Sequence, residues 1–221
     1  MSYDHVLLPA GIATTADAVE TYLAAQQGRH QTDVVAEIAA EVNRRNDVLP
    51  EQERFLSIDV GGAGTGNVGG AGTGAALYVP AQYDAIGHVR GLLFELATPR
   101  DYALYDPQLN WLIDPIDRVD VTVTHGGAGE FPYLTQRLAQ QWVTELAAPN
   151  PYLIVERADH VYIQTYRDES GGYTLEHRDG GPDRHFAVRL AGGDQVATLI
   201  WDWTTGDRGR LDTLAWEPVR F

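Results

Sequence analysis

Apolar residues recur along the chain with two spacings, which predict helices and strands in irregular alternation. Helical spacing of apolar residues predicts helices that start at Thr14 or Thr15 and at Thr32 or Asp33, and further helices over 83–97 and 132–147. Short apolar runs and period-two alternation predict strands over 3–8, 55–60, 75–79, 102–105, 111–113 and 119–124. Irregular alternation of this kind over the first 148 residues indicates an α+β arrangement.

The last third of the chain has a denser pattern of strands. Four runs, at 152–157, 160–167, 172–178 and 184–190, are separated only by short turns, which is typical of an antiparallel meander. Apolar residues at helical spacing over 194–203 predict one helix that covers this four-stranded sheet. Because Pro149-Asn150-Pro151 is the strongest break in the chain, we expect an α+β domain over 1–148 and a second module over 151–221.

A glycine-rich repeat follows the strand predicted at 55–60. Gly64, Gly66 and Gly69 formally match the G-x-G-x-x-G pattern of dinucleotide-binding loops. Such a loop has to open a helix, whose N-terminal N–H groups hold the phosphates, but a strand-like run at 75–79 follows here. The chain also contains no lysine, which a P-loop needs. The repeat therefore predicts a hairpin loop over 61–74, and we expect no bound cofactor.

The charge of the chain narrows the class of partner. Its 31 acidic and 16 basic residues give a formal net charge of -15. This balance disfavours nucleic acid and anionic membranes as direct ligands and favours a basic protein, although the charge is equally compatible with a role in solubility alone. No apolar run is long enough to span a membrane, and residues 1–9 do not resemble a secretory signal, so we expect a cytoplasmic location.

The histidines of the last third are candidates for catalysis or metal binding. If Leu175 lies opposite Val188 in the predicted meander and both are buried, His177 lies on the buried face and His185 on the other. A metal shared by the two rings is therefore disfavoured, and the absence of cysteine removes thiolate ligands. The sequence predicts no metal site and no catalytic residue.

The tyrosines at 162 and 166 suggest a different kind of site. They alternate with Val161, Ile163 and Thr165, so the two sets lie on opposite faces of one strand. If Val161 and Ile163 are buried, the tyrosines form an exposed row of the kind that protein interfaces favour; the opposite assignment, with the tyrosines in the core, is compatible with the same alternation. The predicted contact residues for a protein partner are Tyr162, Gln164, Tyr166, Asp168 and Glu169.

Three motifs of the last third carry a resemblance to a family. They are YTLEHRDGGPDRHF at 173–186, WDWTTG at 201–206 and WEP at 216–218. This pattern resembles the C-terminal part of actinobacterial immunity-type proteins associated with polymorphic secreted toxins. The resemblance covers about the last 70 residues, and it implies a protein without catalysis of its own that binds one cognate toxin domain and occludes its active site.

Two other functions fit the residues. The chain would be a small-ligand-binding protein or an enzyme if the cleft between the two expected parts formed a site. It would be a scaffold subunit if it formed a defined homo-oligomer. The sequence leaves the oligomeric state open.

Overall fold

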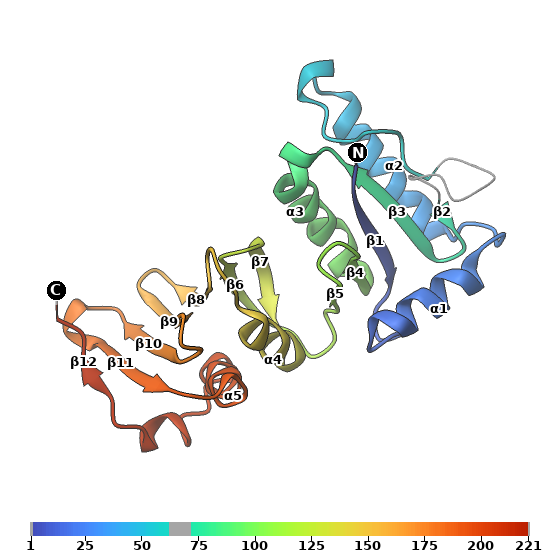
Figure 1. Cartoon of the computed structure of the whole chain (residues 1–221). Coiled ribbons are helices and arrows are strands. Elements are labelled where there is room, and N and C mark those ends of the chain that lie inside the picture. Colours follow the sequence, from blue (N-terminus) through green and yellow to red (C-terminus); the bar gives the residue numbers. More distant parts are fainter. Residues whose placement is uncertain (1, 62–71, 221) are drawn as a thin grey trace. The chain divides into compact units, whose positions relative to one another are not determined.

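The computed structural model describes residues 2–61 and 72–220, and it divides into two compact units, Met1–Ile116 and Asp117–Phe221 (Figure 1). Both units combine helices with an antiparallel sheet, so the predicted mixture of helices and strands is confirmed. The ten residues 62–71, which make up most of the glycine-rich repeat, lie outside the described residues, and with them the hairpin loop predicted over 61–74.

The first unit contains a five-stranded sheet. In spatial order its strands are β2 (Gly72–Thr73), β3 (Ala76–Ala81), β1 (Tyr3–Pro9), β4 (Tyr102–Asp106) and β5 (Trp111–Ile113), and every neighbouring pair is antiparallel. Its helices are α1 (Ala16–Gln26), α2 (Asp33–Asp47) and α3 (Ile86–Ala97). Short 3-10 turns cover Glu51–Glu53, Tyr83–Ala85 and Thr98–Arg100.

The central strand β1 is covered on both faces. Val6, Leu7 and Leu8 are consecutive and all fully buried, as expected of a strand between two layers. Val6 and Leu8 pack in a cluster with Val19 of α1, while α3 contacts β1 and β4. Both predicted N-caps are present: Thr15 accepts a hydrogen bond from the backbone N–H of Ala18, and Thr32 accepts one from that of Val35.

The segment 55–60 differs from the predicted strand. It makes a single bridge, between Leu56 and Ala81, instead of a ladder. Two asparagines of α2 satisfy its backbone: Asn46 accepts hydrogen bonds from the N–H groups of Phe55 and Leu56, and Asn43 binds both the N–H and the C=O of Val60. Two backbone hydrogen bonds accompany the bridge: the N–H of Ser57 donates to the C=O of Pro80, and the N–H of Gln82 donates to the C=O of Phe55. The backbone of this buried segment is therefore satisfied partly by side chains and partly by the neighbouring main chain.

The second unit contains a seven-stranded antiparallel sheet. In spatial order its strands are β12 (Glu217–Pro218), β11 (His185–Leu190), β10 (Tyr173–Asp179), β9 (Val161–Arg167), β8 (Tyr152–Ala158), β6 (Val119–His125) and β7 (Gly129–Leu134). Its helices are α4 (Gln136–Glu145) and α5 (Gly193–Thr205), and 3-10 turns cover Pro182–Arg184 and Leu211–Thr213. The strands β8 to β11 pair in sequence order, as the predicted meander requires.

The sheet is larger than the predicted four strands because β6 and β7 join it beside β8 and the short β12 joins it beside β11. Thr122 and Val123 of β6 pair with Glu156 and Val155 of β8, so 119–134 belongs with the last third of the chain. The boundary expected at 148–151 therefore lies inside the second unit, and the division between the units falls at 116–117. A local pattern cannot show such a pairing, since strands with the same alternation can join either sheet.

Residues 129–134 form a strand where a loop and the start of a helix were predicted. Phe131 and Tyr133 are buried and alternate with the exposed Glu130 and Pro132, which is strand periodicity. The proline is tolerated because β7 lies at the edge of the sheet. The helix consequently begins only at Gln136, after the Thr135 cap.

The core of the second unit lies between the sheet and its two helices. The helix α5 contacts β6, β8, β9, β10 and β11, and α4 packs against α5 and β8. Two helices, α4 and α5, therefore lie with this sheet, where a single helix over 194–203 was predicted. The buried strand residues that face them include Val155, Ile163 and Leu175, and α5 contributes Leu199 and Ile200.

Candidate functional site

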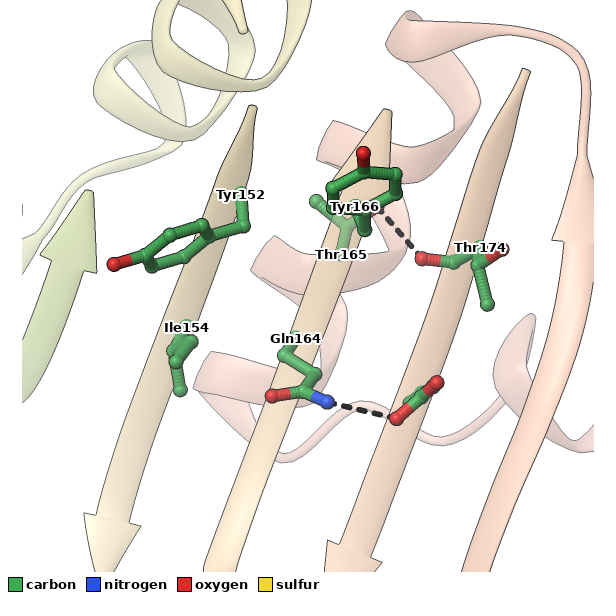
Figure 2. A pocket seen from close by; sticks show the side chains of 7 residues that line it. Tyr152, Ile154, Gln164, Thr165, Tyr166 and Thr174 are labelled. Atoms are coloured by element: carbon green, nitrogen blue, oxygen red, sulfur yellow. Dashed lines mark hydrogen bonds between the residues drawn. The ribbon is translucent and has the colours of Figure 1, made fainter. Parts of the chain in front are cut away.

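The strand face opposite the buried residues of β8, β9 and β10 is the candidate site. We call it the outer face and define it by the alternate residues Tyr152, Ile154 and Glu156 of β8; Tyr162, Gln164 and Tyr166 of β9; and Thr174, Glu176 and Arg178 of β10. Figure 2 shows the helices behind these strands and the labelled outer-face side chains in front. All nine residues are at least partly exposed, and Tyr166 is 50% exposed.

The structure decides between the two faces of β9 that the sequence left open. Ile163 and Thr165 are buried at 0% and 1% exposure, so Tyr162, Gln164 and Tyr166 lie outward. Of the two alternatives that the sequence left open, the structure has the one in which Ile163 is buried and the tyrosines of β9 lie on the outward side. Whether these residues contact a partner stays a prediction.

A hollow of about 290 Å³ lies in the outer face. The residues that line it are Tyr152, Ile154, Gln164, Thr165, Tyr166, Thr174 and Glu176. Tyr152 lies directly opposite Tyr166, and Gln164 lies opposite both Ile154 and Glu176, so the register of three strands brings the lining together. Figure 2 shows Tyr152 and Tyr166 at one end of the hollow and Ile154 and Gln164 at the other.

The polar part of the hollow is a hydrogen-bonded group around one carboxylate. Gln164 Nε2 donates to Glu176 Oε2 at 2.7 Å, a bond drawn in Figure 2, and His185 Nε2 lies 3.1 Å from the same oxygen. The side chain of Glu176 is 25% exposed and that of His185 is 4% exposed. The ring of Tyr162 meets the ring of His185 edge-on, with 6.0 Å between centroids. These contacts hold the carboxylate in one orientation at the surface.

The two remaining predicted contact residues lie beyond the hollow, in the turn from β9 to β10. Asp168 accepts hydrogen bonds from the hydroxyl and the N–H of Ser170 and from the N–H of Gly172, and it pairs with Arg189 at 3.1 Å. The bond from the Ser170 hydroxyl is the main cause that lowers the pKa of Asp168. Asp168 therefore holds its own turn together. Glu169 is exposed beside it.

Sequence reasoning missed Tyr152, Ile154 and Thr174 as parts of the site. In β8 the outward Tyr152 and Ile154 alternate with the inward Leu153 and Val155, so both faces are apolar. A strand of this kind has no polar face to mark the outward side. The pairing of Tyr152 with Tyr166 would have assigned Tyr152 to the site. That pairing depends on the register between β8 and β9.

The predicted separation of the two histidines is confirmed. Leu175 pairs with Val188 and His177 with Phe186, while His185 pairs with Arg178 on the outer face. Burial lowers the pKa of His177, whose ring packs edge-on against Trp216 at 4.5 Å. Among residues 2–61 and 72–220, His, Asp and Glu side chains form no group of three or more with the spacing of metal ligands.

The first unit contains a second polar group, which is enclosed in its core. Arg90 Nη2 lies 3.4 Å from Asp106 Oδ2, and the hydroxyl of Tyr3 donates to the same oxygen at 2.7 Å. Burial, followed by the hydrogen bond to Asp106, raises the pKa of Tyr3. His5 is 0% exposed, and burial lowers its pKa to about 3, with a smaller contribution from the positive Arg90. All four side chains are buried, and the most exposed of them, Tyr3, is 9% exposed.

The comparisons with known proteins place the chain in no family. No family model, curated protein or solved structure matches it. Within the part of the chain that the structure describes, no helix combines the length and the apolar character that crossing a bilayer requires.

Proposed function

We propose that the chain is an immunity-type inhibitor, which binds a basic toxin domain through the outer face of its second unit and occludes the toxin's active site. The observation that carries the proposal is the exposed tyrosine row beside the hollow. Tyr166 is 50% exposed and lies opposite Tyr152, on a face made of paired strands whose backbone is already satisfied. Aromatic anchors of this type supply much of the binding free energy of protein interfaces.

The charge of the chain supports a basic partner. A net charge of -15 attracts a positively charged domain over long range and speeds its encounter with the inhibitor. The tyrosines, once buried in the complex, would set how slowly it dissociates. An inhibitor of this kind acts in the cytoplasm of the cell that makes the toxin. The alternative of a ligand or enzyme site between the two parts stays a prediction, as does the scaffold.

The test uses a toxin-like domain encoded in a reading frame adjacent to the gene for this chain as the candidate partner. We expect the wild-type chain to bind that domain and to restore growth when the two are co-expressed. The variant Tyr166→Ala should weaken binding by about 30-fold, because truncation of a central aromatic residue in an interface costs about 2 kcal/mol. Tyr83→Ala is the matched control, since Tyr83 is a comparably exposed tyrosine, at 58%, in the first unit.

The two possible failures have different meanings. A wild-type chain that neither binds nor neutralises the toxin would reject the inhibitor function. A toxin complex that tolerates Tyr166→Ala as well as Tyr83→Ala would retain the function but reject the outer face as the binding surface.

A further inference from the structure

The hollow in the outer face is chemically asymmetric. Of the described residues that line it, Glu176 alone is charged, and the others are two tyrosines, an isoleucine, a glutamine and two threonines. The hydrogen bonds that the Glu176 side chain accepts from Gln164 and His185 both go to Oε2. Oε1 receives no hydrogen bond from the described residues. The carboxylate of Glu176, which has a formal negative charge, can therefore accept further hydrogen bonds from a group in the hollow.

The neighbouring cationic side chains of the same sheet face are engaged elsewhere. Arg178 Nε donates to the carbonyl oxygen of Gly180 at 2.9 Å, and Arg189 Nη2 pairs with Asp168 at 3.1 Å. Neither of these guanidinium groups is held by Glu176. The carboxylate is instead oriented by an amide and an imidazole, which leave its charge uncompensated by arginine.

The tyrosines complete a site for a positive charge. Tyr152 and Tyr166 face each other across β8 and β9, so their Cβ atoms are separated by about 4.5–5.5 Å, the usual spacing of directly opposed residues. Glu176 is diagonal to Tyr166 on the next strand, within reach of a long side chain. Cations bind favourably over tyrosine rings, and a carboxylate close to those rings adds a charge-assisted hydrogen bond.

We propose that this hollow receives a cationic side chain, an arginine or lysine of the protein partner, which donates to Glu176 Oε1 while it packs against the rings of Tyr152 and Tyr166. This inference rests on the proposed function and gives it a specific contact. It also explains why a net acidic chain presents tyrosines at this point: the rings bind the apolar stem and the charge of the same side chain. A flat guanidinium can stack on a ring and donate at the same time, so arginine should bind more tightly than lysine.

The test is a titration of the full-length, isotope-labelled chain, followed by NMR. The probes are N-acetyl-arginine amide, N-acetyl-lysine amide and, as a neutral isostere of arginine, N-acetyl-citrulline amide. We expect the two cationic probes to shift amide resonances of β8, β9 and β10 selectively and the citrulline probe to leave them in place. Because the attraction is electrostatic at a surface, affinity should fall as salt is raised from about 0.01 M to 0.5 M.

Two variants and one control make the test specific. Glu176→Gln keeps an acceptor for Gln164 but removes the charge, and it should weaken the arginine probe by about 10-fold. Tyr166→Ala removes one ring from an exposed position and should weaken the probe by roughly 2- to 5-fold. Glu130→Gln removes an exposed charge of β7, outside the hollow, and should leave binding unchanged. The amide spectrum of each variant reports whether it is folded.

Shifts that map elsewhere, or equal shifts with citrulline, would overturn the inference. So would an arginine affinity that Glu176→Gln leaves at the wild-type value. These outcomes are separable from a failure of the proposed function. If toxin binding depends on Tyr166 but the chain does not bind the arginine and lysine probes, only the cation site is rejected. A chain that binds the probes but neutralises no toxin rejects only the inhibitor.

Discussion

The buried imidazole of His5 should make the first unit lose stability as the pH falls. Burial lowers the pKa of His5 to about 3, whereas a histidine in an unfolded chain has a pKa of about 6.5. Below pH 6.5 the His5 imidazole therefore becomes protonated in the unfolded chain but stays neutral in the folded chain. The stability is fully present above about pH 6.5 and is lost, by about 1.4 kcal/mol per pH unit, as the pH falls toward 3.

The effect between neutral and mildly acidic pH is large enough to measure. Integration of the linkage between pH 7 and pH 5 gives a loss of about 2 kcal/mol from this one group. The perturbation is His5→Phe, which retains a ring beside Tyr3, where the two ring centroids are now 5.2 Å apart, and removes the titrating group. The variant should lose about 2 kcal/mol less than the wild type over the same pH interval.

The assay is hydrogen exchange of the β1 amides in the full chain, which reports on the first unit separately from the second. The exchange rates are corrected for the intrinsic effect of pH on exchange. All other titratable groups are present in both proteins, so their contributions cancel in the comparison. His5→Gln is a second variant in case the larger ring packs poorly, and His30→Gln, at an exposed position, should show the wild-type pH dependence. An equal loss in the wild type and both His5 variants would refute the reasoning.

Two further predictions concern contacts that hold each unit together. Asp106→Asn should destabilise the first unit by about 3–5 kcal/mol, measured by urea unfolding, because it removes the carboxylate charge of a buried ion pair with Arg90. A loss below about 1 kcal/mol would show that this ion pair contributes little to stability. Gly126→Ala should destabilise the second unit by about 1–3 kcal/mol, because an added Cβ would collide with the backbone oxygen of Asn150, whereas Gly127→Ala meets only ordinary contacts and serves as the control; equal melting temperatures for the two variants would contradict this.

Local signals in the sequence were sufficient wherever the structure depends on nearby residues. Threonine caps marked the starts of α1 and α2, and the strand predicted at 75–79 is observed as β3. The register of β10 and β11 was also predictable, because pairing Leu175 with Val188 places both on the inner face, where Leu175 is buried and Val188 is partly buried. A one-residue slip would have moved an entire apolar set to the outer face.

The predictions failed where the outcome depends on contacts distant in the sequence. The segment 55–60 has the composition of a strand, but Asn43 and Asn46 of α2 bind part of its backbone, and it forms only one bridge to β3. The residues 129–134 contain a proline, which disfavours a strand except at a sheet edge, and only the assembled sheet shows that β7 is an edge.

For the candidate site, the sequence by itself determined that Tyr162, Gln164 and Tyr166 share one face of a strand, since side chains alternate with a period of two. It did not determine whether that face is buried, because both sets of alternating residues contain bulky apolar groups. Only the tertiary structure decided this: α5 packs on Ile163 and its neighbours, and the tyrosines are left outward. The hollow with Tyr152 and Glu176 likewise exists only because three strands pair in one register, a property that no single strand carries.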